Sequence, residues 1–500
     1  MNRTLYLAAV AALAATLSLP TDSFAQALWS PSVPENAPPP ADVPDRVPMT
    51  VSAAAEPVPA LEYRLLPTTQ ERTPGNAATY YYRAMLHLKS IPQDYFKKYA
   101  ESQERWTEKP LDGESAEEIR KYLEAFPNVF SETKTAVYRE ECEWNLGLEQ
   151  LKGPETISFL LHDFQEMREI TRLLELRFRL ELYENRLDDA WETLRQLTQL
   201  GRDSAQPTLL INGLIGIAIE SIMLGRLEDF ISHPEAPNVY WALATLPDPL
   251  VDLAPSVEFE ATIGPRMFPM LEEAERSRTP EQWQADLQEA WNSLRYMGAS
   301  TSMGMGNDSG QPSLAEGAAA LGYAMTRYPI AKSLLIESGR TSEEVDAMPV
   351  GQALLLAEKI AYRRVYDEML KTYYLPLHVR VERGDEFQDR LEALMKEEPI
   401  PIAQLLLPAV QAVSHAQIRL VYRLRGIQAI EAIRDFAAEE GRLPRRLQEV
   451  RRLPMPVDPY TLENFGYEVT GQTATLRVIV PGSPQRGSSK IYELNLRQSD

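Results

Sequence analysis

The amino-acid sequence predicts a mainly α-helical protein, with an irregular α-solenoid-like helical body before a small C-terminal module of one long helix and an antiparallel sheet. Three observations support this fold class. Helix-start signals recur through residues 61–400, a helix–turn motif recurs after about 40 residues, and convincing strand patterns appear only after residue 464. We divide the chain into a signal segment, 1–25, a linker, 26–60, the helical body, 61–400, and the C-terminal module, 401–500.

The N-terminus has the pattern of a secretory signal peptide. Asn2 and Arg3 precede an apolar run, and small-residue cleavage patterns end at Ala25 and at Ala27. The run is about 15 residues long, shorter than the roughly 20 needed to span a bilayer. We expect export to the periplasm or the extracellular space, with no transmembrane span after signal cleavage. An uncleaved N-terminal anchor is the alternative.

The linker is rich in proline and poor in aromatic residues. Its prolines from residue 28 onward are Pro31, Pro34, Pro38, Pro39, Pro40, Pro44, Pro48, Pro57 and Pro59. Such a composition cannot bury a core and favours an extended, solvated chain. We therefore expect residues 26–60 to be a disordered tether.

Within the body, several helices have recognisable starts. We expect them at Asn76, at Ser115 with Glu118 in a capping box, and at two further boxes that begin with Thr279 and Thr341. The stretch 174–186, "LELRFRLELYENR", alternates like a strand, but its composition of mainly Leu, Glu and Arg, with no Val, Ile or Thr, favours a helix. On a helix it has two apolar sides, so we expect a helix packed between neighbours.

A turn motif follows this helix and recurs. Residues 185–190, "NRLDDA", correspond to residues 225–230, "GRLEDF", and each places Asn or Gly where we expect the chain to leave a helix. The stretch "ENRLDDAWETL", with Ala190 at a small-residue position, resembles the turn and second helix of a tetratricopeptide repeat. The resemblance covers about 170–232 and implies stacked helical hairpins.

Two internal segments have distinctive compositions. Residues 208–224 are the most apolar, but Asn212, Glu220 and the length favour a buried helix over a membrane span. Residues 298–313 contain closely spaced glycines but follow a helix, whereas a dinucleotide-binding fingerprint follows a strand. We expect a flexible loop there, and no cofactor.

The C-terminal module begins with a long helix over 402–440 that ends at Gly441. Three strands are expected after it, at 467–470, 473–480 and 491–496, with a hairpin turn at Gly471-Gln472. This pattern predicts a small antiparallel sheet packed on the helix.

This module resembles the globular half of type II secretion pseudopilins and other pilin-like proteins over about 402–480. The matching residues are "LLLPAVQA" (405–412), Gly441-x-Leu443-Pro444, Pro456-Val457-Asp458-Pro459 and Tyr467. In a pilin this helix is N-terminal, whereas here it follows some 400 residues. The resemblance therefore implies a local fold and not assembly into a pilus.

Nearly all of the mature chain resembles a family of uncharacterised secreted proteins from planctomycete bacteria. The matching stretches are 61–84, 237–253 and 342–359. This resemblance implies export and carries no established activity.

Charge and cysteine content exclude some functions. The formal net charge is −21, so long-range attraction to phosphate is lacking and we expect no nucleic-acid partner. The one cysteine, Cys142, lies between Glu141 and Glu143, whose carboxylates disfavour a thiolate. We expect it to be inert.

None of the five histidines has a metal-ligand spacing. His162-Asp163 is the only adjacent His–Asp pair, and a metal phosphohydrolase would need further ligands, of which His87 is a candidate. A solvated pair early in a helix is the default interpretation. We assign no catalytic, cofactor-binding or metal-binding residue.

Other chemistry-bearing groups have structural explanations. Tyr80-Tyr81-Tyr82 and Tyr240-Trp241 could line a groove but are more often core. The acid pairs Asp188-Asp189 and Glu343-Glu344 lie in first turns of helices, where the helix dipole favours them. A basic patch could dock an anionic polymer or an acidic face of the same protein, although a solvated or intramolecular role is the default; its members are Arg442, Arg445, Arg446, Arg451 and Arg452.

Two functions remain open. The first is a non-enzymatic exported scaffold that binds another envelope protein or a peptide. The second is an envelope hydrolase with a site between helices, using His162, Asp163 or scattered acids.

Overall fold

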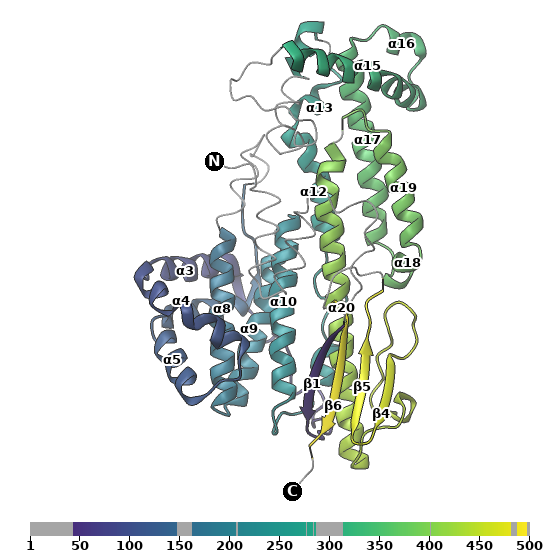
Figure 1. Ribbon diagram of the computed structural model, residues 1–500. Coiled ribbons are helices and arrows are strands. Elements are labelled where there is room, and N and C mark those ends of the chain that lie inside the picture. Colours follow the sequence, from purple (N-terminus) through teal and green to yellow (C-terminus); the bar gives the residue numbers. More distant parts are fainter. Residues whose placement is uncertain are drawn as a thin grey trace. The chain divides into compact units, whose positions relative to one another are not determined.

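The computed structural model describes residues 44–147, 163–206, 209–276, 278–283, 285–286, 314–400, 402–481 and 488–497. The signal segment, the linker up to residue 43, the loop 298–313 and His162 lie outside the described residues. The fold is mainly helical with a small sheet of C-terminal strands, as predicted (Figure 1).

The described residues form two compact units. We call the first of them, Leu253–Ala412 together with Gly147, the middle unit, and residues 44–146, 163–252 and 413–497 the sheet unit. The division follows tertiary contacts rather than chain order, so residues 61–400 contribute to both units.

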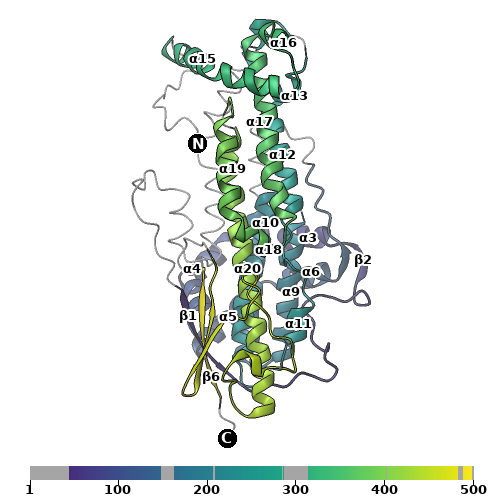
Figure 2. The same ribbon diagram turned by 90° about the vertical axis from the view of Figure 1, so that its right-hand side faces the viewer.

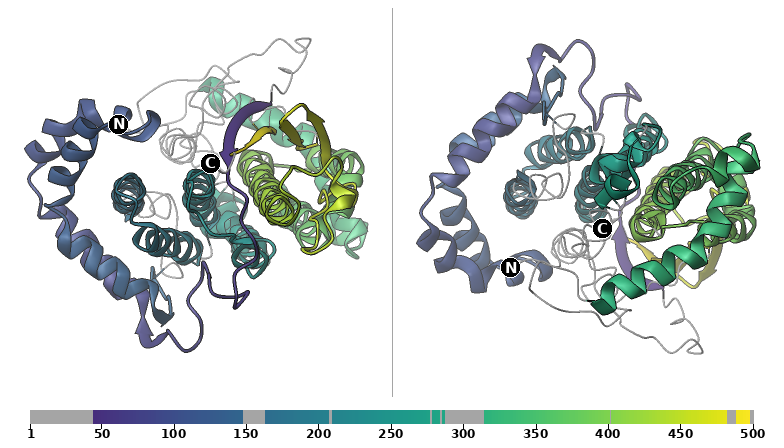
Figure 3. Two further views of the ribbon diagram at one scale, coloured as in Figure 1. Left: turned by 90° about the horizontal axis from the view of Figure 1, so that it is seen from below. Right: turned by 90° about the horizontal axis from the view of Figure 1, so that it is seen from above.

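The sheet unit combines a helical layer with a sheet. Its helices are α3 (Ala77–Lys89), α4 (Gln93–Glu108), α5 (Gly113–Leu123), α6 (Pro127–Val137), α8 (Asp163–Tyr183), α9 (Leu187–Ala205), α10 (Leu210–Ile231), α11 (Tyr240–Ala244), the part of α20 (Ile402–Glu440) from Val413 on, and the short 3₁₀ helix η2 (Leu447–Glu449). Seen end-on, α3–α6 form an outer layer beside α8 and α9 (Figure 3). Strands β2 (Thr73–Asn76) and β3 (Arg139–Glu141) form a separate parallel pair beside α3.

Most predicted helix starts are confirmed. The Asn76 side chain caps α3 by accepting from the Ala78 N–H, and Thr341 and Glu344 form the predicted capping box. The prediction for Ser115 is wrong, because α5 begins at Gly113 and Asp112 is its N-cap. Asp112 accepts a hydrogen bond from the Ser115 N–H, so Ser115 lies in the first turn that is capped.

The alternating stretch from residue 174 forms the last part of α8, a helix and not a strand. Both of its apolar sides are buried, as the positions of Leu173 and Leu176 on one side and Leu174 and Phe178 on the other show. The chain leaves the helix at Asn185, which has a positive φ of 57°. The sandwiched helix and its turn are therefore confirmed.

The predicted second copy of this turn is wrong. Residues 225–230 lie inside α10, which continues without a break to Ile231. Gly225 instead lets the Arg423 side chain lie close to the α10 backbone, because a Cβ at this position would lie 3.1 Å from the Arg423 guanidinium nitrogen Nη2. The recurrence in sequence is therefore not a recurrence of helix–turn–helix structure.

Helix α10 is the one helix of the described chain that is long and apolar enough to cross a membrane. In the structure 78% of its most apolar window is buried. It packs mainly against α9, where Gly216 lies against the Gly201 carbonyl and Ala205. The prediction of a buried helix over 208–224 is confirmed for residues 210–224.

The sheet has four strands in the order β1-β6-β5-β4 (Figure 1). Its strands are β1 (Asp45–Val51), β4 (Gly466–Thr470), β5 (Thr473–Val478) and β6 (Lys490–Leu496). The three C-terminal strands and their antiparallel pairing are confirmed. The fourth strand corrects the prediction of a disordered tether up to residue 60, because β1 pairs in parallel with β6.

Strand β1 is an edge strand, which is why it tolerates Pro48. Its Met49 and Val51 side chains are buried and Thr50 between them is exposed, which is the alternation of a strand with one buried face. Helix α20 covers the inner face of the sheet, where Gly426 lies against Val478 and Tyr492. It ends at Gly441, with φ of 67°, as predicted.

The middle unit is a bundle organised around α17 (Val350–Tyr373). Its other helices are α12 (Ala254–Met267), α13 (Pro269–Glu273), α15 (Leu314–Glu337), α16 (Ser342–Asp346), α18 (Leu377–Glu382), α19 (Gly384–Lys396) and the start of α20. Figure 2 shows α19 beside α17, and α12, α13 and α15 also pack on α17. This arrangement places three helices around an open cleft.

Candidate functional site

The middle unit contains a cleft of about 750 Å³ between α12, α13 and α17. Its lining residues are Ala261, Thr262, Pro265, Arg266, Pro269, Glu272, Glu273, Arg276, Lys359, Tyr362, Arg363, Tyr366 and Asp367. This volume falls within the range of ligand pockets, about 300–1,000 Å³.

Two prolines shape one wall of the cleft. Pro265 lies inside α12, where it cannot donate to the Ala261 carbonyl one turn earlier. Pro269 starts α13 directly after Phe268, whose φ of −122° and ψ of 73° are not helical. The chain therefore breaks between the two helices, and both prolines face the cleft.

Aromatic side chains of α17 form the floor. Tyr362 and Tyr366 are one helical turn apart, and their ring centroids lie 4.6 Å apart. Both side chains are buried. The Tyr362 hydroxyl donates to the Glu260 carbonyl at 3.4 Å, which fixes the ring on α12.

Charged groups of both signs form the rim. Lys359 Nζ lies 3.5 Å from Glu272 Oε2, and Arg363 Nε lies 3.8 Å from Asp367 Oδ2. The Arg363 side chain is 84% exposed. Exposed ion pairs of this kind contribute about 0–1 kcal/mol, so a bound molecule can replace them at little cost.

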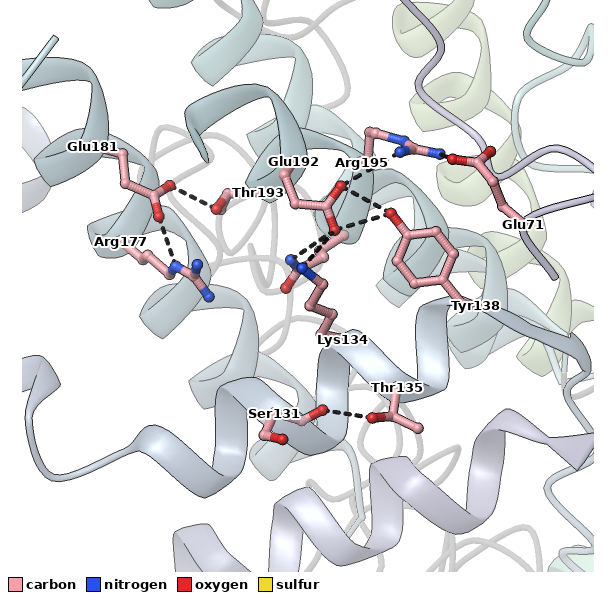
Figure 4. Close-up of polar contacts among 11 residues, drawn as sticks. Glu71, Ser131, Lys134, Thr135, Tyr138, Arg177, Glu181, Glu192, Thr193 and Arg195 are labelled. Carbon is pink, nitrogen blue, oxygen red and sulfur yellow. Dashed lines mark hydrogen bonds and ion pairs between the residues drawn. The ribbon is translucent and has the colours of Figure 1, made fainter. Parts of the chain in front are cut away.

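A second polar constellation, in the sheet unit, is centred on Glu192 of α9 (Figure 4). The Tyr138 hydroxyl donates to Glu192 Oε2 at 2.8 Å, and Lys134 Nζ lies 3.7 Å from Oε1. Arg195 lies 3.4 Å from the same carboxylate and 2.8 Å from Glu71. These contacts join α6 to α9 and to the segment before β2.

The chemistry of this constellation favours a structural role. Burial and the Glu192 carboxylate raise the pKa of Tyr138, so its hydroxyl stays protonated. Nearby, Glu181 accepts from Thr193 at 2.7 Å and pairs with Arg177 at 2.7 Å (Figure 4). Burial raises the pKa of Glu181 despite these partners. The groups hold the helices together rather than presenting a nucleophile.

The structure does not test the hypothesis of a metal site at His162, Asp163 and His87. His162 lies outside the described residues, Asp163 begins α8, and His87 is on α3. Among the described residues, no group of three or more His, Cys, Asp or Glu side chains could hold a metal ion.

The Cys142 thiol is disfavoured from ionising for a different reason from the one expected. Burial first, and then the Asp203 carboxylate, raise the pKa of its thiol. Its Sγ lies 3.8 Å from the Asp203 carbonyl oxygen. The neighbouring Glu141 and Glu143 of the sequence are exposed. The thiol therefore stays protonated, as predicted, through tertiary contacts.

Of the aromatic candidates, Tyr81 and Tyr240 are buried, whereas Tyr80, Tyr82 and Trp241 are partly buried. Tyr81 is buried and donates to Asp203 Oδ2 at 2.7 Å, while Tyr240 donates to the Pro454 carbonyl at 2.6 Å. Trp241 donates to Glu56 at 2.5 Å. The acid pairs lie in first turns of helices, as expected: Asp188 and Asp189 in α9, and Glu343 and Glu344 in α16.

Sequence reasoning missed the cleft because its walls lie far apart along the chain. Ala261 to Arg276 form one wall and Lys359 to Asp367 the other. The available signals were the closely spaced Pro265 and Pro269 and the tyrosines at i and i+4. No family model, curated protein or solved structure matches this chain.

Proposed function

We propose that the chain is an exported, non-enzymatic binding protein that holds an extended segment of an envelope protein or peptide in the cleft of the middle unit. The observation that carries this proposal is the cleft itself, with a tyrosine floor between two charged rims. An extended peptide presents alternating apolar and charged side chains, which suit such a floor and rim. The signal-like N-terminus of the sequence supports export.

The rim gives the cleft its means of selection. Arg363 and Lys359 are paired only loosely, and exchanging these partners for ligand carboxylates costs little. The packed rings of Tyr362 and Tyr366 are buried, so the base of the cleft is rigid and need not rearrange when a ligand binds. Both features favour binding over bond cleavage. The hydrolase hypothesis built on His162 and Asp163 stays a prediction.

Selection from a random peptide library on the purified full chain tests this function. We expect enriched peptides whose affinity falls about tenfold in Arg363→Glu, because a rim cation becomes an anion. Arg383→Glu is the matched control, since Arg383 is exposed in the same unit and outside the cleft lining. Its affinity should stay within about twofold of the wild type.

Two results would count against the proposal. The first is a selection that enriches no peptide. The second is enriched peptides that bind Arg363→Glu as tightly as the wild type. A photo-crosslinking residue at Thr262 should capture the peptide, and one at Asp389, on the exposed surface of α19, should not.

A further inference from the structure

The segment that follows α20 carries a dense group of arginines. We call residues 441–453 the arginine loop. It contains Arg442, Arg445, Arg446, Arg451 and Arg452, and a single acid, Glu449. The chain as a whole has 72 acidic and 51 basic residues, so this loop reverses the local charge of an acidic protein.

Buried apolar residues alternate with the arginines and fix the loop. Leu443, Leu447, Val450 and Leu453 are all buried. Val450 and Leu453 pack with Phe436 of α20 in one apolar cluster. The arginines between these anchors point to solvent, because every arginine of the loop is exposed.

Polar contacts add to this rigidity. The Glu449 carboxylate accepts from the Arg445 backbone N–H at 3.4 Å and pairs with Arg442 at 3.1 Å. Arg442 also lies over the Phe436 ring, 5.2 Å from its centroid. A loop held in this way loses little conformational entropy when it binds a partner.

Three of the arginines form no salt bridge within the described chain. Arg442 pairs with Glu449, and Arg452 lies 3.5 Å from Asp435. Arg445, Arg446 and Arg451 form no salt bridge with a described residue, although Arg446 acts electrostatically on Glu449. A guanidinium matches the planar geometry of a carboxylate and binds it with two parallel hydrogen bonds.

We infer that the arginine loop docks a short acidic segment of a partner protein. Charge complementarity supplies the attraction, and the preformed loop limits its entropic cost. The net charge of −21 limits the partner's size, because an extended polyanion or an anionic membrane would be repelled by the rest of the surface. A short segment contacts only the loop, since salt screens other charges within about 8–10 Å.

This surface is independent of the proposed cleft, because it belongs to the sheet unit and uses different residues. The probe is a fluorescent decapeptide of five glutamates separated by Gly and Ser, with a glutamine version as its neutral counterpart. By fluorescence anisotropy, we expect the full chain to bind the acidic peptide and not the glutamine peptide. Binding should be weaker at 300 mM NaCl than at 50 mM NaCl.

The triple variant Arg445→Gln, Arg446→Gln, Arg451→Gln should weaken this binding by about tenfold. The matched control is Arg46→Gln, Arg383→Gln, Arg477→Gln, which removes three exposed arginines that have ion-pair partners. Its affinity should stay within about twofold. Thermal unfolding of both variants verifies that each is folded.

Three outcomes would overturn the inference. They are no binding of the acidic peptide, equal binding by the triple variant and the wild type, and equal binding of the glutamine peptide. Vesicles of phosphatidylglycerol and phosphatidylcholine are tested in parallel. Arginine-dependent binding to these vesicles without peptide binding would place the partner in a lipid surface instead.

Discussion

Glu220 lies on α10 with its side chain fully buried, and neither carboxylate oxygen has a hydrogen-bond partner among the described residues. Burial raises its pKa well above the usual value, and Arg202 offsets this only in part. A carboxyl with a raised folded-state pKa holds its proton in the fold and loses it when unfolded. It therefore stabilises the protein at low pH, and this contribution is lost as the pH rises above about 4.3.

We expect Glu220→Gln to raise the free energy of unfolding by about 1–3 kcal/mol at pH 8 and to change it little at pH 4.5. The amide has the same shape but does not titrate. Urea unfolding at both pH values measures the difference. Glu140→Gln, at an exposed glutamate, is the control. An equal effect of Glu220→Gln at both pH values would contradict the assignment of a buried, protonated acid.

Tyr138 makes the shortest contacts to Glu192, with distances of 2.8 and 3.0 Å to its two oxygens. We expect Tyr138→Phe to lower the free energy of unfolding by about 1–2 kcal/mol, because the carboxylate loses a donor in a half-buried site. Chemical denaturation measures this loss. Tyr183→Phe, at an exposed ring, should be neutral. A neutral Tyr138→Phe would show that solvent replaces the hydroxyl.

At the scale of elements, the contact between α20 and β5 depends on a glycine. A Cβ on Gly426 would lie 2.7 Å from Val478 Cγ2. We expect Gly426→Ala to destabilise the sheet unit by about 1–3 kcal/mol through overpacking. The double variant with Val478→Ala should cost less than the two single changes together, because the second change makes room for the methyl group.

Gly384→Ala is the control for Gly426→Ala, since a Cβ at Gly384, at the start of α19, would meet open space. Its unfolding temperature should stay equal or rise slightly, as alanine favours helix. If the double variant loses as much stability as the two single variants together, the contact between Gly426 and Val478 is not what destabilises Gly426→Ala.

The elements that could be predicted are those whose signal is local. The end of α8 is rich in Leu, Glu and Arg and has no Val, Ile or Thr, so its composition outweighs its alternation. Strands β4, β5 and β6 have strand patterns of their own. Strand β1 could not be predicted in this way. Pro48 fits a strand only at the edge of a sheet, and β1 becomes an edge strand only by pairing with β6, which lies far away in the sequence.

The failed predictions have the same origin. Gly225 resembles a helix end, but its absent side chain makes room for Arg423, which is distant in sequence. The cleft joins Pro265 to Tyr362 through packing that no short motif encodes. The sequence shows the cluster of arginines in the arginine loop. Only the tertiary structure shows that Arg442 and Arg452 form ion pairs.

At the scale of the whole molecule, several buried acids act together. Burial raises the pKa of Asp203 to about 6. It also raises the pKa values of other buried acids, among them Glu175, Glu181, Glu220 and Glu358. Glu228 has the opposite shift: burial raises its pKa, but the Arg423 guanidinium and other partners together outweigh this and lower it. Among these buried acids raised pKa values outnumber lowered ones, so this set lowers the stability as the pH rises above the unfolded pKa values. Exposed acids with lowered pKa values, such as Glu344 and Glu386, act in the opposite direction, but solvent screens them more strongly.

We expect the unfolding temperature to be highest near pH 5 and to fall by roughly 5 °C by pH 8. Lowering the pH also reduces the repulsion that accompanies a net charge of −21. Calorimetry between pH 4.5 and 9 at constant ionic strength measures this dependence. An unfolding temperature that rises steadily to pH 8 would contradict it. In Glu220→Gln the fall should be smaller.

The pairing of β1 with β6 also sets an order of events. Arg46 of β1 pairs with Glu493 of β6, and these residues are 447 positions apart in the chain. A ribosome makes β1 early and β6 late, at about 5–20 residues per second. Synthesis of the residues between the two strands therefore takes at least about 20 seconds, and β1 can pair with β6 only after all of them have been made.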